Sequence, residues 1–308
     1  MRRIGIIIGL LLALVGVVWI LQGLRVAFAP QSFMTGNRQW AVRGGLAVAI
    51  GLFLAGWSSR RSPGADVGQP IATPAKRGPE QVTTALVSGT AAYNVAQNVI
   101  LPSWSYVPLN AAATVGLFKL AGRLGLTRAE VGSDRAHLAR GIRIGASLGA
   151  VTVIGIAAAI AIPGTRSLFR DERVIGVGVG GALLQALIRL PVGTALFEET
   201  LFRGVLFAWL RRRTSTLRAT VGSSVLFGLW HALPAWGTIS LYQEGAIRDA
   251  GAAASIGVVV GGVVASGMAG AGLVWLRLRT NSLAAPVIVH AVANSASYLA
   301  AFAIARWL

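Results

Sequence analysis

Two adjacent glutamates, Glu198 and Glu199, are the residues whose type and position in this chain most clearly indicate chemistry. The chain has ten acidic residues. The other eight lie in predicted linkers, loops or segment ends, whereas this pair stands inside the apolar stretch 182–210. A carboxylate in the hydrocarbon region of a bilayer costs several kcal/mol, so it normally faces the interior of a helix bundle and finds a partner there. The pair therefore predicts a functional site.

Two further polar clusters lie in the apolar stretches that follow. One is PheGlyLeuTrpHis, which ends at His231, and the other contains His290 and Asn294. At a rise of 1.5 Å per residue, Glu198, His231 and His290 each lie roughly 17–20 Å from an arginine that marks a segment end. This depth is near or somewhat beyond the middle of a hydrocarbon core about 30 Å thick. The three clusters are therefore expected to lie at a similar level.

A spacing of four residues puts two pairs of these side chains on common helix faces. Glu199 and Arg203 can form an ion pair that lowers the cost of burying either one. Glu198 is rotated by about 100° from its neighbour, so it can face the histidines instead. His290 and Asn294 are also four residues apart and can point at one spot.

These residue types suit the hydrolysis of an amide by an activated water. A carboxylate in a weakly polar site binds a proton more readily, which suits a general base, and a neighbouring histidine can share or shuttle that proton. A histidine with an asparagine can polarise a carbonyl and stabilise an oxyanion. Each cluster alone is more often structural than catalytic, and Phe227 is more often a core-filling residue than a catalytic one. Their joint occurrence at one depth favours catalysis.

Composition indicates which elements must position the clusters. The chain has 308 residues, of which 55% are hydrophobic and 12% charged, whereas about 25% are charged in a soluble domain. We expect an all-α polytopic membrane protein with a bundle of about 7–9 transmembrane helices. Apolar runs long enough to span a bilayer, or nearly so, lie at about 4–24, 40–57, 84–101, 105–122, 144–163, 175–210, 218–236, 251–276 and 281–305.

The charge pattern and the linkers divide the chain further. We expect a two-span membrane module at residues 1–57, a flexible linker at 58–83 that is rich in Pro, Gly and charge, and the larger bundle at 84–308. The net charge of +18 comes from arginines at segment ends, so we predict no nucleic acid binding. The same rule predicts a cytoplasmic N-terminus, and we expect a multi-pass protein of the plasma membrane. Only two lysines among 28 basic residues favour a bacterial source.

At the three clusters the chain resembles the CPBP family of intramembrane proteases, the CAAX-protease and bacteriocin-processing family that is also called ABI. GluGluThrLeuPheArg matches the GluGlu-x-x-x-Arg motif of that family, PheGlyLeuTrpHis matches Phe-x-x-x-His, and HisAlaValAlaAsn matches His-x-x-x-Asn, in the same order. The resemblance covers roughly residues 84–308, with the motifs within about 182–300. The first 57 residues look like an appended module.

The resemblance implies a glutamate-dependent intramembrane endopeptidase, similar to the type II CAAX prenyl endopeptidases. It implies that Glu198 and His231 activate the attacking water. It also implies that His290 and Asn294 form the oxyanion site, with the other motif residues in support. The implied partners are a membrane-embedded or membrane-associated protein or peptide substrate and the lipid bilayer. Neither a cofactor nor a metal is expected.

Three other functions stay open at this point. A non-hydrolytic immunity or scaffold protein would keep its phenotype when Glu198 is substituted. A metalloprotease could use Glu198, His231 and His290 as zinc ligands, since two histidines and a glutamate suffice for catalytic zinc, although no His-Glu-x-x-His pair is present. A proton-coupled transporter would use buried Glu and His as a relay, but no internal repeat marks a substrate path.

Overall fold

The computed structural model describes residues 15–22, 24, 40, 42–45, 47–48, 51, 78–169, 171–241 and 251–307. They belong to two compact units, Met1–Ile100 and Leu101–Leu308. Every regular element in the described residues is helical, which confirms the all-α fold. Four helical stretches are long and apolar enough to cross a membrane, namely Arg135–Ala161, Val179–Arg211, Ile256–Thr280 and Ala284–Trp307. The predicted runs 84–101, 105–122 and 218–236 are not among these four, and the first two runs lie largely outside the described residues, so the total of seven to nine spans stays a prediction.

In the first unit, two short helical pieces from the predicted two-span module pack closely. A side chain added at Gly16 would collide with the backbone at Gly44, and the rings of Trp19 and Trp40 meet edge to face with centroids 5.2 Å apart. The longest described helix of this unit is α3 (Pro79–Val95), which begins with a proline and continues into a π-helical turn, η1 (Ala96–Ile100). The predicted domain boundaries at residues 57 and 83 stay predictions.

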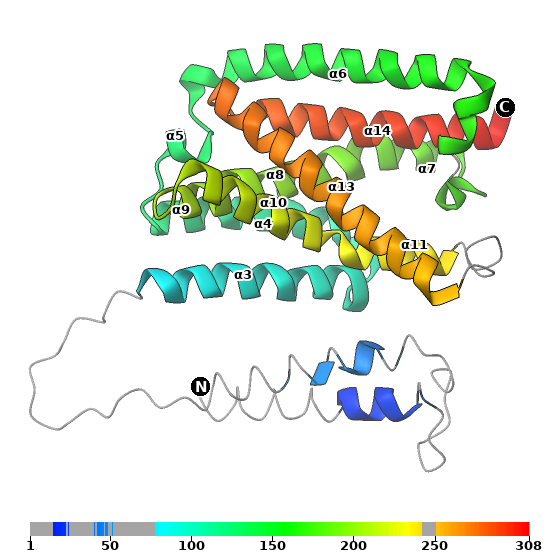
Figure 1. Ribbon diagram of the computed structural model, residues 1–308, viewed down its shortest axis with the longest axis horizontal. Coiled ribbons are helices and arrows are strands. Elements are labelled where there is room, and N and C mark those ends of the chain that lie inside the picture. Colours follow the sequence, from blue (N-terminus) through cyan, green and yellow to red (C-terminus); the bar gives the residue numbers. More distant parts are fainter. Residues whose placement is uncertain are drawn as a thin grey trace, which may run out of the picture. The chain divides into compact units, whose positions relative to one another are not determined.

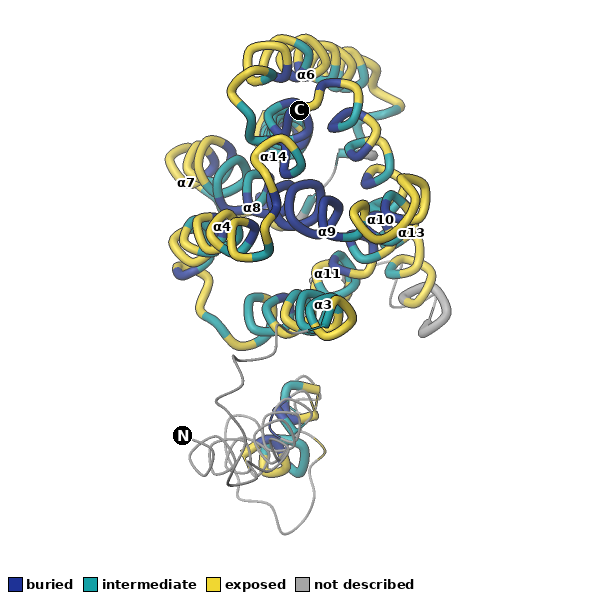
Figure 2. The backbone as a smooth tube through the Cα atoms, turned by 90° about the vertical axis from the view of Figure 1, so that its left-hand side faces the viewer, coloured by how far each residue is buried: buried dark blue, intermediate teal, exposed yellow. Residues whose placement is uncertain are grey.

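The second unit is a helix bundle (Figure 1). Its α-helices are α4 (Tyr106–Arg123), α5 (Arg128–Val131), α6 (Leu138–Ala161), α7 (Val179–Leu184), α8 (Phe197–Glu199), α9 (Phe207–Arg211), α10 (Thr216–Trp230), α11 (Ala232–Leu241), α13 (Gly251–Thr280) and α14 (Ala284–Trp307). Two π-helical stretches, η6 (Gln185–Leu196) and η7 (Thr200–Leu206), join α7, α8 and α9 into a continuous helical segment, the central helix. Short 3₁₀ turns lie at Ser103–Ser105, Arg135–His137, Pro163–Phe169 and Glu172–Val174. Figure 2 shows that the central helix is most deeply buried around α8 and α9.

A proline within the central helix sets how α14 packs on it. In a π-helix each N–H bonds the carbonyl five residues earlier, but Pro191 has no N–H to offer the carbonyl of Ala186. The hydroxyl of Ser295 on α14 donates to that carbonyl instead, at 2.7 Å. This bond between side chain and backbone fixes the position of α14 along the central helix. Ser295 directly follows Asn294 in the sequence.

Small residues allow close approach between the other long helices. Gly141, Gly145 and Gly149 face α14 from α6, and a side chain at Gly141 would collide with Ser282. Between α10 and α13, a Cβ at Gly228 would lie only 2.5 Å from the carbonyl oxygen of Val263. Such small-residue contacts are typical of helix packing in membranes.

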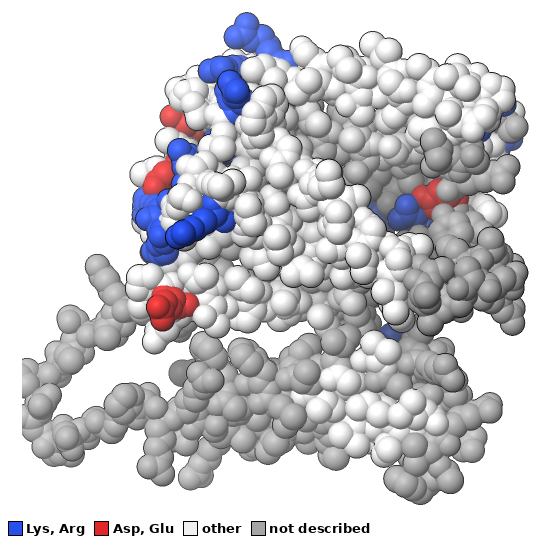
Figure 3. Space-filling model, viewed as in Figure 1, with Lys and Arg blue, Asp and Glu red and all other residues white. Residues whose placement is uncertain are grey.

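Basic residues gather at one end of the second unit (Figure 3). This is the end where α4, α9 and α13 finish and where α6, α10 and α14 begin. There Arg212 pairs with Glu130, whose backbone carbonyl in turn accepts from Arg277 at 3.0 Å. Arg212 also donates to the carbonyl of Gly125 at 2.7 Å. These contacts, here called the loop junction, tie α5 to the ends of α9 and α13.

Candidate active site

The central helix carries both glutamates at its most buried point. The relative exposures of Glu198 and Glu199 are 3% and 0%. One turn later, Arg203 donates from Nη1 to Oε1 of Glu199 at 2.9 Å, and both side chains of this pair are fully buried. This confirms the ion pair predicted from the spacing of four residues. Since a lone buried charge is costly, each member of the pair stabilises the other.

His290 lies between the two glutamates and connects α14 to the central helix. Its Nδ1 donates to Oε1 of Glu199 at 2.8 Å, and its Nε2 lies 3.9 Å from Oε2 of Glu198. The sequence predicted histidines near Glu198 but not the bond to Glu199. One imidazole can reach both because its two nitrogens lie on different sides of the ring. With Arg203 and a protonated His290, the two carboxylates form a group with no net charge.

The aromatic ring of Phe227 on α10 lies against three of the polar residues. Its centroid is 3.8 Å from Cζ of Arg203, 4.6 Å from the ring of His231 and 6.0 Å from that of His290. The ring stacks on the guanidinium as a cation–π contact, which helps to offset the burial of Arg203. Phe227 thus contacts polar side chains in addition to filling the core, and its supporting role stays a prediction.

His231 stands where α10 ends and α11 begins, so the predicted run 218–236 is two helices rather than one. Its Nδ1 lies 2.8 Å from the carbonyl oxygen of Phe227. Because a carbonyl only accepts, Nδ1 carries the hydrogen and Nε2 of a neutral ring is left as an acceptor. His231 is partly buried, as is Asn294. Within the described residues, neither His231 nor Asn294 makes a hydrogen bond to Glu198 or His290.

The two oxygens of Glu198 have different surroundings. The indole Nε1–H of Trp230 donates to Oε1 at 2.9 Å. Oε2 is buried and has no hydrogen-bond partner among the described residues. It is the atom that faces Nε2 of His290. The arrangement leaves one basic oxygen available in a deeply buried site, where a water or a substrate proton would be its partner.

Two residues at the site were not singled out from the sequence. Trp230 occupies a variable position of the second motif. The feature of the sequence that could have identified it is an indole N–H donor next to His231 in an apolar helix. Tyr106 on α4 bonds Thr194 at 3.1 Å and lies within the electrostatic influence of Glu198. No pattern in the sequence links Tyr106 to the glutamates, because α4 meets the central helix through tertiary contacts such as its packing on Gly193.

The structure bears on the zinc ligand set considered for Glu198, His231 and His290. Among the described residues, no three His, Cys, Asp or Glu side chains are grouped so that they could hold a metal ion. Glu198, His231 and His290 therefore do not fit the zinc ligand set in this conformation. Instead, Glu199 holds His290 by its Nδ1, and Trp230 holds one oxygen of Glu198.

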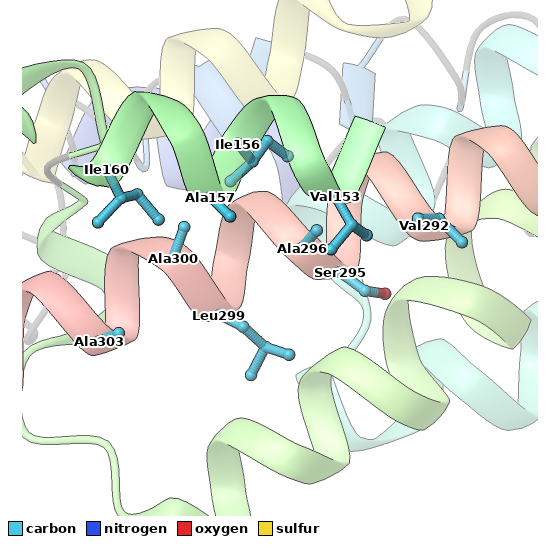
Figure 4. Close-up of a pocket in the computed structure, with 10 residues that line it drawn as sticks. All are labelled: Val153, Ile156, Ala157, Ile160, Val292, Ser295, Ala296, Leu299, Ala300 and Ala303. Atoms are coloured by element: carbon cyan, nitrogen blue, oxygen red, sulfur yellow. The ribbon is translucent and has the colours of Figure 1, made fainter. Parts of the chain in front are cut away.

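An open apolar groove of about 450 Å³ lies apart from these residues, between α6 and α14. Figure 4 shows side chains of the two helices, such as Ile156 and Leu299, lining it. Ser295 is the polar exception among the lining residues, and its hydroxyl is already bonded to Ala186. Val292, between His290 and Asn294, lines the groove, but Glu198, His231, His290 and Asn294 do not.

Comparison with known proteins identifies one family. Residues 180–296 match the family model described as type II CAAX prenyl endopeptidase Rce1-like. The matched range contains all the motif residues named above, which confirms the family resemblance for this part of the chain. Neither a curated protein nor a solved structure matches the chain.

Proposed function

We propose that this protein, whose residues 180–296 match the Rce1-like type II CAAX prenyl endopeptidase family model, cleaves a peptide bond in the membrane with a water activated by Glu198. One observation carries the proposal. The buried, unpartnered Oε2 of Glu198 faces Nε2 of His290 at 3.9 Å, while its other oxygen is held by Trp230. A water bound beside Oε2 would have a base on one side and a histidine on another.

In the proposed first step, Oε2 of Glu198 takes a proton from this water as its oxygen attacks the scissile carbonyl carbon. The C–O bond forms and the carbonyl oxygen becomes an oxyanion. His231 can share the water's second hydrogen, because the bond from its Nδ1 to Phe227 leaves Nε2 as an acceptor. Glu198 then delivers its proton to the amide nitrogen, and the C–N bond breaks.

The oxyanion would be stabilised from α14. A protonated His290 donates from Nδ1 to Glu199 and presents Nε2–H toward the site. Asn294 lies about one turn further along the same helix and adds an amide donor. Arg203 and Glu199 thus support catalysis by holding His290 in place. Donors that are fixed before the reaction stabilise developing charge most effectively.

The test compares peptide termini in membranes and medium from cells that produce the wild type, Glu198→Gln or Glu80→Gln at matched levels. Glu80 is an exposed acid near the start of α3 and serves as the control. We expect new termini with the wild type and the control, but not with Glu198→Gln. Identical termini in all three, with an unchanged biological phenotype, would contradict the proposal and favour an immunity or scaffold role.

A further inference from the structure

We propose that Trp230 is a positioning residue for this reaction. It holds Glu198 so that only Oε2 can accept the proton of the water. The inference rests on the proposed role of Glu198. Both residues are buried, with exposures of 7% and 3%, and the indole Nε1–H donates to Oε1 at 2.9 Å. A carboxylate with one oxygen fixed in this way cannot rotate without breaking a buried hydrogen bond.

The chemistry of the indole suits this task. Its N–H is a donor only and carries no charge, so it neither takes the proton itself nor neutralises the carboxylate. Glu199 is in the opposite situation, since its Oε1 accepts from the cationic Arg203 and from His290. His290 also faces Oε2 of Glu198, but at 3.9 Å and without a hydrogen bond, so the direct donor to Glu198 is the neutral indole and Glu198 is left as the base. Glu199 is bonded directly to Arg203 and His290 and is a structural anion. The type of partner separates the roles of two neighbouring glutamates.

The indole ring is itself held by the helix that carries Glu198. Trp230 packs against Phe197 and Phe202, with ring centroids 5.9 and 5.6 Å away. These phenylalanines lie on either side of Glu198 in the sequence, and both are almost fully buried. On the α10 side, Gly228 packs against α13 and fixes the end of the helix. The donor and its acceptor are thus supported by the same packing.

Replacement of the indole N–H alone tests the positioning role of Trp230. Benzothienylalanine at position 230 keeps a fused ring of similar size but has sulfur in place of the N–H. We expect kcat for a cleaved peptide to fall roughly 10- to 100-fold, the loss expected for one hydrogen bond to a charged group. KM and the melting temperature should change little, because the ring still fills its site. The same replacement at Trp209, a buried ring in α9, is the control and should leave kcat unchanged.

Each outcome has a definite meaning. An unchanged kcat at position 230 would overturn the positioning role, and so would a loss of activity that follows a lower melting temperature. Trp230→Phe provides a second measurement, since it also lacks the donor and should show the same split between kcat and KM. If Glu198→Gln cleaves the peptide as fast as the wild type, the proposed function itself fails. If Glu198→Gln is inactive and the position 230 variants are fully active, only the role of Trp230 fails.

Discussion

At the scale of single residues, the stability of the site depends on the compensation of charge by Arg203. The guanidinium is fully buried, bonds Glu199 and stacks on Phe227. Arg203→Ala would leave the carboxylate buried with one cation fewer. Loss of one partner of a buried pair costs about 3–5 kcal/mol, so we expect the free energy of unfolding in detergent to fall by about that amount. Arg218→Ala, an exposed arginine of α10, should change it by less than about 0.5 kcal/mol. Equal effects of the two substitutions would contradict this account.

The residue contacts show where prediction from the sequence works. The ion pair between Glu199 and Arg203 is local on one helix, so a spacing of four residues was enough to predict it. The bonds from His290 to Glu199 and from Trp230 to Glu198 join residues 91 and 32 positions apart. They depend on how α14 and α10 are rotated against the central helix, and one sequence does not specify that rotation.

At the scale of helices, the contact between α10 and α13 controls the position of the second motif. Gly228 lies between Phe227 and Trp230, and a Cβ there would meet the carbonyl of Val263 at 2.5 Å. Gly228→Ala should therefore push α10 from α13, lower the free energy of unfolding by about 1–3 kcal/mol and reduce cleavage. Activity assays and thermal unfolding would measure both effects.

The matched control is Gly272→Ala on α13, where an added Cβ meets nothing within 4 Å. Alanine is the better helix former by about 1 kcal/mol, so this variant should be at least as stable as the wild type and equally active. If Gly228→Ala is as well tolerated as Gly272→Ala, the close packing of α10 is not important for the site.

Apolar runs in the sequence indicated where helices lie but not how they deviate from regular geometry. Pro191 and Pro234 lie near the motifs, and a proline within a helix removes a backbone hydrogen bond. The structure shows two different results: a π-helical stretch that contains Pro191, and a helix break three residues before Pro234. Which form occurs depends on tertiary partners, such as the hydroxyl of Ser295 that satisfies the carbonyl of Ala186.

At the scale of the whole molecule, the basic end of the second unit predicts its orientation in the membrane. The positive-inside rule places the loop between α9 and α10 in the cytoplasm and the segment after α6 on the other side. Since the chain has no cysteine, single cysteines at Thr214 and Gly164 can be labelled without background. Both positions are exposed. We expect an impermeant thiol reagent added outside intact cells to label Gly164→Cys but not Thr214→Cys. Labelling of both from one side would contradict the orientation.

The loop junction at this basic end makes the stability of the fold depend on pH. Hydrogen bonds from Arg212 are the main reason that the pKa of Glu130 is lowered from 4.5 to about 2. Because the folded state favours the ionised form, the contribution of Glu130 is complete above about pH 4.5. It falls as the pH decreases toward 2 and is absent once the folded protein is protonated. Glu130→Gln should therefore lower the melting temperature at pH 7, and its difference from the wild type should shrink as the pH falls toward 2.

Substitution of the partner separates this effect from general acid sensitivity. Arg212→Gln removes the hydrogen bonds to Glu130 and also the one to Gly125. The double variant Glu130→Gln/Arg212→Gln should therefore lose little more stability than Arg212→Gln alone. Additive losses would show that the two residues act independently. A difference between the wild type and Glu130→Gln that persists unchanged from pH 7 to pH 2 would show that the carboxylate acts through its shape rather than its charge. The junction ties α5 to the ends of α9 and α13, so protonation of Glu130 should loosen that end of the bundle first.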